Sequence, residues 1–171
     1  MREKNIVLIG MPGSGKSTVG VILAKTLGMD FVDCDILIST REDCTLQEIL
    51  DERGLDAFLK VEEETILETD FHGTVVATGG SVPLSEKAME HLAKNGEFVY
   101  IDVPLHELVR RIHNITTRGI AFGPGQTLED VFHQREPIYK KWADHIVEID
   151  LDNNVTEHVV EKVLRAVQEE A

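Results

Sequence analysis

Residues 10–17, GMPGSGKS, combine three glycines, a lysine and a hydroxyl in the order G-x-x-x-x-G-K-[ST]. Glycines let successive backbone N–H groups turn toward one centre, and a helix N-terminus directly after them adds positive potential. In such a loop the lysine bridges the outer phosphates and the hydroxyl can bind Mg²⁺. The pattern predicts a phosphate loop over residues 10–18 with these ligand-binding residues: Gly13, Ser14, Gly15, Lys16, Ser17 and Thr18. The alternative is a chance glycine turn with an exposed lysine.

Two carboxylates, Asp33 and Asp35, follow a short apolar run in the sequence FVDCD. Residues i and i+2 of a strand share a face, about 7 Å apart, so both acids could address one site beyond the strand's carboxyl end. Ligands of open parallel sheets bind there. One acid could orient the water shell of Mg²⁺ while the other takes the proton of an attacking hydroxyl. Solvated or helix-capping acids are the alternative, and Asp102, which follows the apolar run 98–101, is a second candidate magnesium partner.

Glycines and arginines elsewhere add further candidates. Gly79 and Gly80 end the run VVAT, where the missing Cβ lets a ligand approach the backbone; a tight turn is the plainer explanation. Arg135 lies on an otherwise apolar helical stripe, where a guanidinium is costly to desolvate unless it meets an anion, either a ligand or an internal Glu or Asp. Arg118 lies in a glycine-rich segment and could swing toward a transferring phosphate when that loop closes, or be a surface residue.

The elements that must position these residues alternate between β-branched runs and amphipathic stretches, as in β-α units. Strands are expected at 5–9, 31–32, 74–77, 98–101 and 146–149, and helices at about 19–27, 45–54, 56–69, 85–95, 105–112, from 127 onward, and 155–167. Glycine and proline within 119–125 forbid regular structure and predict either a functional lid or a disordered loop. Five strands alternating with helices predict an α/β fold, a parallel sheet covered on both faces.

Composition limits the classes of function. A chain of 171 residues with 42% hydrophobic residues fits one domain, residues 1–171. A net charge of −14 argues against nucleic acid as a partner, because phosphate neutralisation needs a basic footprint. No apolar run approaches the ~20 residues of a membrane helix, and the N-terminus does not read as a signal peptide. We therefore expect a cytoplasmic protein without a membrane partner, a monomer that acts on a small molecule. Cys34 and Cys44 lack metal-ligand spacing and predict reduced thiols.

Taken in order, these motifs resemble the shikimate kinase family: a phosphate loop near the N-terminus, D-x-D after the second strand, a strand ending in glycines, an arginine in the lid, and R-x-P-x-Y in the next helix. The resemblance covers roughly residues 4–165. It implies a P-loop NTPase fold of three layers, α/β/α, with a five-stranded parallel sheet in the order 2-3-1-4-5. It also implies a single kinase domain that uses ATP and Mg²⁺, with a substrate-binding segment at about 33–62 and a lid at about 113–126.

On the nucleotide side, the resemblance implies that Lys16 and Arg118 contact the transferring phosphate and that Arg111 stacks on adenine. Ser17 would bind the metal directly, and Asp33 would contact it through water.

On the acceptor side, it implies that Asp35 meets the substrate hydroxyl and that Gly79 and Gly80 lie against the substrate ring. Arg135 would hold the carboxylate of the substrate. Lys16, Asp35 and Arg118 would together be the catalytic residues.

Three positions depart from the family pattern. Leu59 stands where the family has a second carboxylate-binding arginine, so Glu62, one turn further, lacks the partner it would normally pair with. Ser81 replaces the third glycine of the run, and the lid reads Arg118-Gly119-Ile120 instead of R-P-L. A charge-assisted hydrogen bond contributes ~1.5–3 kcal/mol, so losing one arginine predicts roughly ten- to a hundred-fold weaker carboxylate binding.

The sequence thus predicts a small-molecule kinase that phosphorylates a hydroxyl of a small hydroxylated carboxylic acid, with shikimate as the first candidate. Two alternatives stay open. One is a kinase of the same type with a different small hydroxylated acid or polyol as acceptor. The other is a nucleotide-binding regulator that has lost catalysis, with Leu59 and Ser81 as signs of decay.

Overall fold

The sheet of the computed structural model, which describes residues 3–112, 120–150, 152 and 155–168, consists of five parallel strands in the order β2-β3-β1-β4-β5. In chain order the strands are β1 (Asn5–Ile9), β2 (Asp30–Asp33), β3 (Thr74–Ala77), β4 (Gly96–Asp102) and β5 (His145–Glu148). The predicted fold class and strand order are confirmed. Each predicted strand is present, with bounds that differ by at most two residues at either end.

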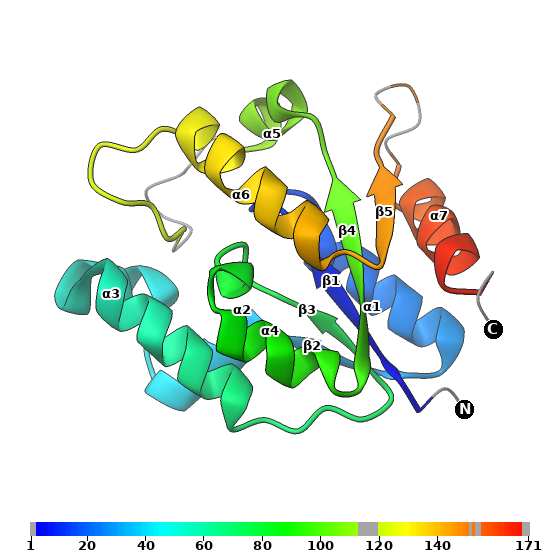
Figure 1. The fold of residues 1–171 in the computed structure, drawn as a ribbon, viewed down its shortest axis with the longest axis horizontal. Coiled ribbons are helices and arrows are strands. Elements are labelled where there is room, and N and C mark those ends of the chain that lie inside the picture. Colours follow the sequence, from blue (N-terminus) through cyan, green and yellow to red (C-terminus); the bar gives the residue numbers. More distant parts are fainter. Residues whose placement is uncertain (1–2, 113–119, 151, 153–154, 169–171) are drawn as a thin grey trace.

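Helices connect the strands and cover the sheet, as parallel strands require. They are α1 (Lys16–Leu27), α2 (Cys34–Glu42), α3 (Leu46–Leu67), α4 (Glu86–Ala93), α5 (Leu105–Arg111), α6 (Leu128–Trp142) and α7 (Thr156–Gln168), with a short 3-10 turn, η1 (Val82–Leu84). Helices α1 and α7 pack against each other, α3 packs on α4, and α6 lies against β4 and η1 (Figure 1). None of the described helices is long and apolar enough to cross a membrane.

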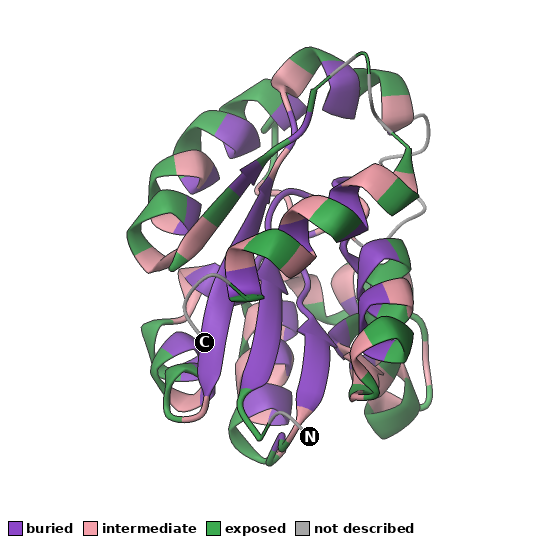
Figure 2. Cartoon of the chain, turned by 90° about the vertical axis from the view of Figure 1, so that its right-hand side faces the viewer, coloured by how far each residue is buried: buried purple, intermediate pink, exposed green. Residues whose placement is uncertain are grey.

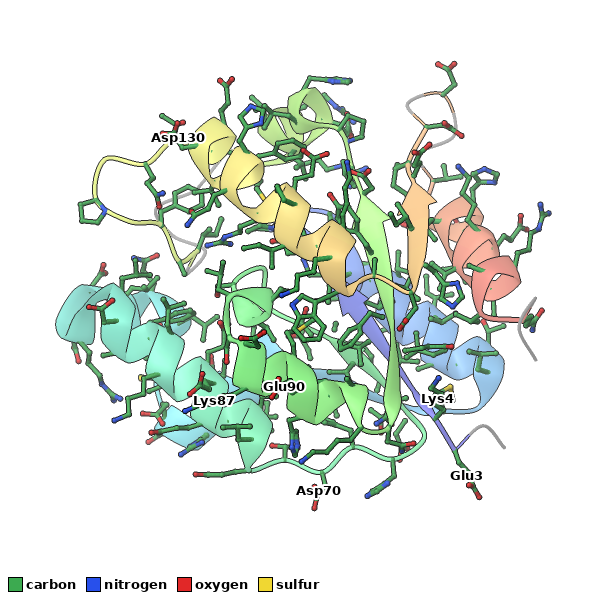
Figure 3. All side chains as sticks on the ribbon, in the orientation of Figure 1. Glu3, Lys4, Asp70, Lys87, Glu90 and Asp130 are labelled. Atoms are coloured by element: carbon green, nitrogen blue, oxygen red, sulfur yellow. The ribbon has the colours of Figure 1, made fainter. Side chains whose placement is uncertain are left out.

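The core is aliphatic and centred on β1 and β3, whose residues are all buried. Figure 2 shows these buried strands between helices whose outer faces are exposed. Strands covered on both faces read as continuous apolar runs, which is why the sequence locates them closely. Charged side chains such as Glu3, Lys87, Glu90 and Asp130 point outward instead (Figure 3).

Caps and glycines set the helix ends. Gly28 ends α1 in the left-handed region, with φ of 66°. Thr45 and Glu48 form the predicted capping box at the start of α3. Gly54, with φ of 83° and ψ of 175°, interrupts α3, so the two helices predicted on either side of this glycine are both present. A second capping box, Thr127 with Asp130, starts α6.

Helix α2 was not predicted. It begins because the Asp33 side chain accepts hydrogen bonds from the backbone N–H groups of Asp35 (2.9 Å) and Ile36 (3.4 Å). The expectation that Asp33 and Asp35 share one face of a strand is therefore wrong, because β2 ends at Asp33 and Asp35 lies in the first turn of a helix.

Candidate active site

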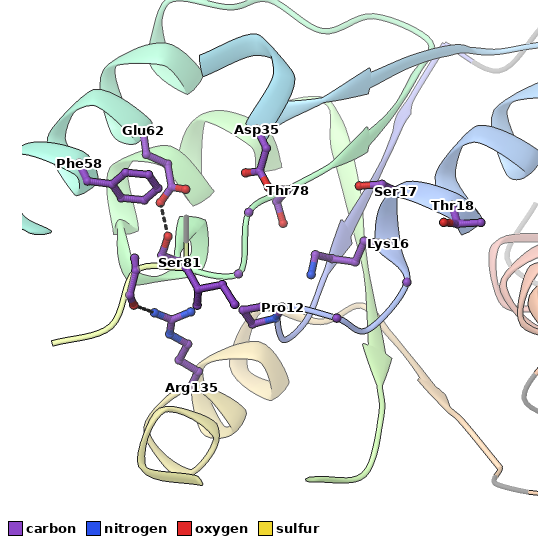
Figure 4. Close-up of a pocket in the computed structure, with 16 residues that line it drawn as sticks. Pro12, Lys16, Ser17, Thr18, Asp35, Phe58, Glu62, Thr78, Ser81 and Arg135 are labelled. Carbon is purple, nitrogen blue, oxygen red and sulfur yellow. Dashed lines mark hydrogen bonds between the residues drawn. The ribbon is translucent and has the colours of Figure 1, made fainter. Parts of the chain in front are cut away.

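The carboxyl ends of the strands open into a cavity of ≈ 280 Å³, the region where open α/β sheets bind ligands. Its walls come from the phosphate loop, the start of α2, the second half of α3, the turn after β3, residues 120–121 and α6 (Figure 4). Lys16, Asp35, Gly79, Gly80 and Arg135, which the sequence assigns to separate motifs, all line it.

The phosphate loop owes its shape to glycines with positive φ: Gly10 (147°), Gly13 (79°) and Gly15 (91°). Side chains other than glycine rarely adopt these angles. Gly15 is also the N-cap of α1, so the loop ends at the positive end of a helix dipole. The loop therefore has the geometry that anion binding requires.

Lys16 is buried, and its Nζ donates hydrogen bonds to the carbonyl oxygens of Gly10 and Met11 (2.8 Å each) and to Ser14 Oγ (3.2 Å). Burial lowers the pKa of Lys16 to about 8, and the nearby carboxylate of Asp35 partly opposes this shift. The exposed lysine of a chance turn is thereby excluded, since the ammonium group is directed into the loop.

Asp33 links the second strand to the phosphate loop. While one oxygen caps α2, the other accepts a hydrogen bond from Ser17 Oγ at 2.5 Å. A hydroxyl and a carboxylate oxygen next to a phosphate loop are hard ligands of the kind that suits Mg²⁺. Asp102 is placed differently: its carboxylate accepts from Tyr100 Oη (3.0 Å) and does not line the cavity. The described residues contain no cluster of three or more His, Cys, Asp or Glu that could hold a metal by themselves.

Asp35 reaches the cavity from the first turn of α2. Its pKa is raised to about 6, first because burial disfavours the charged form and then because Asp33 repels it, while Lys16 acts in the opposite direction. A carboxylate with a pKa near neutrality is a suitable acceptor for the proton of a hydroxyl.

Gly79 and Gly80 are glycines for reasons of space, since neither has a positive φ. A Cβ on Gly79 would lie 2.7 Å from Glu62 Oε2 and 3.0 Å from Asp35 Oδ1, whereas one on Gly80 would lie 2.7 Å from Pro12 Cδ. Gly79 therefore leaves room beside two carboxylates, and Gly80 lets the turn after β3 pack against the phosphate loop. Tyr139 Oη fixes this turn by donating to Gly80 O at 2.6 Å.

Arg135 lies on the buried stripe of α6, as predicted, and is 3% exposed. Its Nη2 donates to the carbonyl oxygen of Ala121, and its Nε is buried without a hydrogen bond to any described residue. Within the described part of the chain, no carboxylate forms an ion pair with it, so the internal salt bridge considered for Arg135 is not seen there. The guanidinium faces the same cavity as Lys16 and Asp35 (Figure 4).

Glu62 is a site residue that sequence reasoning noted only as a carboxylate without its partner. It is 3% exposed, and Ser81 Oγ donates to its Oε1 at 2.7 Å, so the serine at the end of the glycine run supplies a partner. Leu59 is half-buried against an apolar cluster of α2, α3 and Ala121. Phe58 and Ala121 also line the cavity. Neither was named as a site residue from the sequence, although Phe58 stands in the family pattern of a phenylalanine ahead of the glutamate.

Of the two arginines expected on the nucleotide side, Arg111 lies within the described residues. Arg111 lies on the other side of the phosphate loop, where its Nη1 donates to Gly13 O (3.2 Å) and its Nε to Glu107 Oε1 (2.9 Å). With Ser14 and Thr18 it lines a separate hollow of ≈ 260 Å³. Arg118 and the first part of the expected lid lie outside the described residues.

Comparison with known proteins gives a consistent result. The sequence model of the family described as Shikimate kinase matches residues 12–168. Shikimate kinase of Sulfurihydrogenibium sp. (strain YO3AOP1) is 34% identical over 166 residues, which are 96% of this chain and 98% of that protein. Threonine synthase-like 1 of Homo sapiens is 36% identical over 168 residues, which are 97% of this chain but only 22% of the length of that relative.

Solved structures agree with the sequence matches. Shikimate kinase from Acinetobacter baumannii in complex with shikimate superimposes with a TM-score of 0.89 and 28% identity, covering 98% of this chain and 94% of the other. Shikimate kinase from Aquifex aeolicus superimposes with a TM-score of 0.81 and 30% sequence identity, and the match covers 97% of each chain.

Proposed function

The chain belongs to the shikimate kinase family, and from this premise we propose that it transfers the terminal phosphate of ATP to a hydroxyl of a small hydroxylated carboxylic acid, with shikimate as the first acceptor. The observation that carries the proposal is the cavity shared by Lys16, Asp35 and Arg135. It brings a phosphate-binding cation, a carboxylate base and an anion-binding guanidinium to one small space.

The nucleotide half of the proposal uses the phosphate loop. Its N–H groups and Lys16 bind the phosphates of ATP, and Arg111, beside Ser14 and Thr18, is proposed for the adenine side. Ser17 and Asp33 supply oxygen ligands that fit Mg²⁺. When bound, Mg²⁺ neutralises charge on the outer phosphates. Arg118 is proposed as the lid residue that joins Lys16 on the transferring phosphate.

In the acceptor half, Arg135 holds the carboxylate of the substrate and Asp35 orients its hydroxyl. The hydroxyl oxygen forms a bond to the terminal phosphorus as the bond from that phosphorus to the bridging oxygen breaks. ADP leaves with the bond electrons, and the hydroxyl proton passes to Asp35. Because the transition state is loose, positioning and charge stabilisation account for most of the rate.

A coupled ADP-release assay with shikimate tests this function. The wild type should release ADP only when shikimate is present, and Lys16→Ala should lose nearly all turnover because the outer phosphates lose their cation. Turnover of the Lys16→Ala variant at the wild-type rate would contradict the phosphate-loop assignment. Nucleotide binding by the wild type without any acceptor-dependent turnover would favour a regulator instead.

We further propose that the enzyme acts in the cytoplasm as a monomer. Size-exclusion chromatography with light scattering tests the oligomeric state.

A second acceptor remains a candidate because of Leu59. This side chain packs on an apolar cluster next to Glu62 and brings no charge to a substrate carboxylate. A polyol carries no carboxylate and would not need the missing cation. Robust turnover of a polyol or of another hydroxylated acid, without any on shikimate, would make that compound the substrate.

A further inference from the structure

Two parts of the candidate site that serve different substrates in the proposed reaction meet at a narrow contact. The phosphate loop, residues 10–18, binds ATP, whereas the turn after β3 borders the acceptor. A Cβ on Gly80 of this turn would lie 2.7 Å from Pro12 Cδ and 3.2 Å from Pro12 N, so the two segments are in direct contact. The distance between the transferred phosphate and the acceptor hydroxyl therefore depends on how firmly this contact is held.

A buried tyrosine of α6 lies at this contact. Tyr139 is fully buried, and its Oη donates a hydrogen bond to the carbonyl oxygen of Gly80 at 2.6 Å. The same Oη lies 3.8 Å from Sδ of Met11, the residue that precedes Pro12 in the phosphate loop. Met11 and Gly80 are 128 and 59 residues away from Tyr139 in the sequence. The hydroxyl therefore joins two distant segments at the point where they meet.

The neighbours of Tyr139 connect the contact to the ligand-binding groups on both sides. The backbone oxygen of Met11 accepts a hydrogen bond from Lys16 Nζ at 2.8 Å, so a shift of Met11 would also displace the cation proposed for the phosphates. Arg135 precedes Tyr139 by one turn of α6, on the same buried stripe. Tyr139 is thus linked to a group of the nucleotide half and to a group of the acceptor half.

The hydroxyl of Tyr139 acts as a donor and not as a ligand-binding group. Burial raises the pKa of Tyr139 to about 12, with Arg135 acting in the opposite direction, so the hydroxyl keeps its proton at neutral pH. The ring packs against Tyr100, with the ring centroids 5.2 Å apart. Tyr139 is not among the residues that line the cavity, so its effect on a bound substrate must pass through the segments that it holds.

We propose that Tyr139 is a positioning residue for phosphoryl transfer. By holding the Gly80 carbonyl next to Met11, its hydroxyl fixes the turn after β3 against the phosphate loop, and this sets the distance over which the acceptor hydroxyl attacks the terminal phosphorus. A misplacement of about 1 Å can lower a rate about a hundred-fold. The inference rests on the proposed kinase function and adds to it a residue that acts only through the two segments it joins.

The test compares Tyr139→Phe with Tyr100→Phe in the ADP-release assay. Tyr139→Phe keeps the ring but removes the donor to Gly80, so kcat should fall about ten- to a hundred-fold, while KM for ATP and KM for shikimate change by less than about three-fold. Tyr100→Phe is the matched control. Its hydroxyl donates to Asp102 at 3.0 Å, and Asp102 does not line the cavity, so kcat should stay at the wild-type value. Thermal melting shows whether both variants are folded.

Rescue separates a lost hydrogen bond from a disturbed core. Replacing Tyr139 with 4-aminophenylalanine again places a donor at Gly80 O, so kcat should return to within about three-fold of wild type. An unchanged kcat in Tyr139→Phe, an equal loss in Tyr100→Phe, or no recovery with 4-aminophenylalanine would each overturn the inference while the kinase function stood.

Two further outcomes complete the test. If Tyr139→Phe does not fold, 4-fluorophenylalanine, which has a similar size and no donor, takes its place at position 139. Equal kcat for the 4-fluoro and 4-amino forms would then overturn the inference. Wild-type protein without any shikimate-dependent turnover would refute the proposed shikimate reaction itself, before any variant is made.

Discussion

Gly79→Ala is the substitution whose effect follows most directly from the geometry of the cavity. The added methyl carbon would lie 2.7 Å from Glu62 Oε2 and 3.0 Å from Asp35 Oδ1, both closer than a carbon and an oxygen normally approach. The backbone at Gly79 has no positive φ, so the substitution adds no backbone strain. The methyl group instead displaces the two carboxylates and fills the space proposed for the acceptor.

The magnitude can be estimated from overpacking and from the contacts that are lost. Inserting a methyl into a packed site typically costs about 1–3 kcal/mol. Losing the aligned hydrogen bond between Asp35 and the acceptor hydroxyl removes about 1.5–3 kcal/mol more from transition-state binding, so kcat/KM for the acceptor should fall by about a hundred-fold. ATP binding should change by less than about three-fold, because the methyl lies on the acceptor side and not in the phosphate loop.

The assay measures acceptor kinetics by ADP release and ATP affinity by calorimetry on the same preparations. Gly80→Ala, one residue further, is the matched comparison: its methyl would lie 2.7 Å from Pro12 Cδ of the phosphate loop, so ATP affinity should fall there. The reasoning would be refuted if Gly79→Ala kept wild-type acceptor kinetics, or if it weakened ATP binding as strongly as Gly80→Ala.

Three further predictions concern charge. Leu59→Arg should lower KM for shikimate roughly ten-fold by adding a cation beside Glu62; an unchanged KM in the ADP-release assay would contradict this. Asp33→Asn keeps a good N-cap for α2 but loses the negative charge next to Ser17. The Mg²⁺ concentration that gives half-maximal rate should therefore rise several-fold, with little change in Tm. A Mg²⁺ titration that matches wild type would exclude Asp33 from the metal site. Because the folded state raises the pKa of Glu62 from 4.5 to about 7, the protonated form favours folding, and this contribution is lost as pH rises across that window. Melting curves from pH 5 to 8 should therefore show Glu62→Gln gaining stability relative to wild type, on the order of a few kcal/mol, and a constant difference would show that Glu62 does not titrate there.

Much of the fold could be predicted because its signals are local. Buried parallel strands read as apolar runs, and the Thr45 capping box and Gly28 mark helix ends within a few residues of sequence. Helix α2 was missed because Asp35 was interpreted as sharing a strand face with Asp33, whereas Asp33 is both the last residue of β2 and the N-cap of the helix. The predicted element that carries Asp35 was therefore wrong, but its predicted position at the ligand site was right, because Asp35 lines the cavity from the first turn of α2.

The candidate site was less predictable where contacts join distant segments. The stripe of α6 located Arg135 correctly, since helical periodicity alone shows which face is buried. The partnership of Ser81 with Glu62 joins residues far apart in sequence, and only the packing of α3 against the turn after β3 creates it. The two departures Leu59 and Ser81 line one hollow together with Glu62, and Ser81 donates a hydrogen bond to its carboxylate.

Phosphorus NMR of the wild-type protein incubated with ATP, Mg²⁺ and shikimate follows the transferred phosphate itself. We expect a phosphate monoester signal to grow at the same rate as ADP forms, and no such signal to grow with Lys16→Ala. ATP that is hydrolysed to inorganic phosphate at the same rate with and without shikimate, and no ester, would contradict the claim that this cavity joins nucleotide and acceptor.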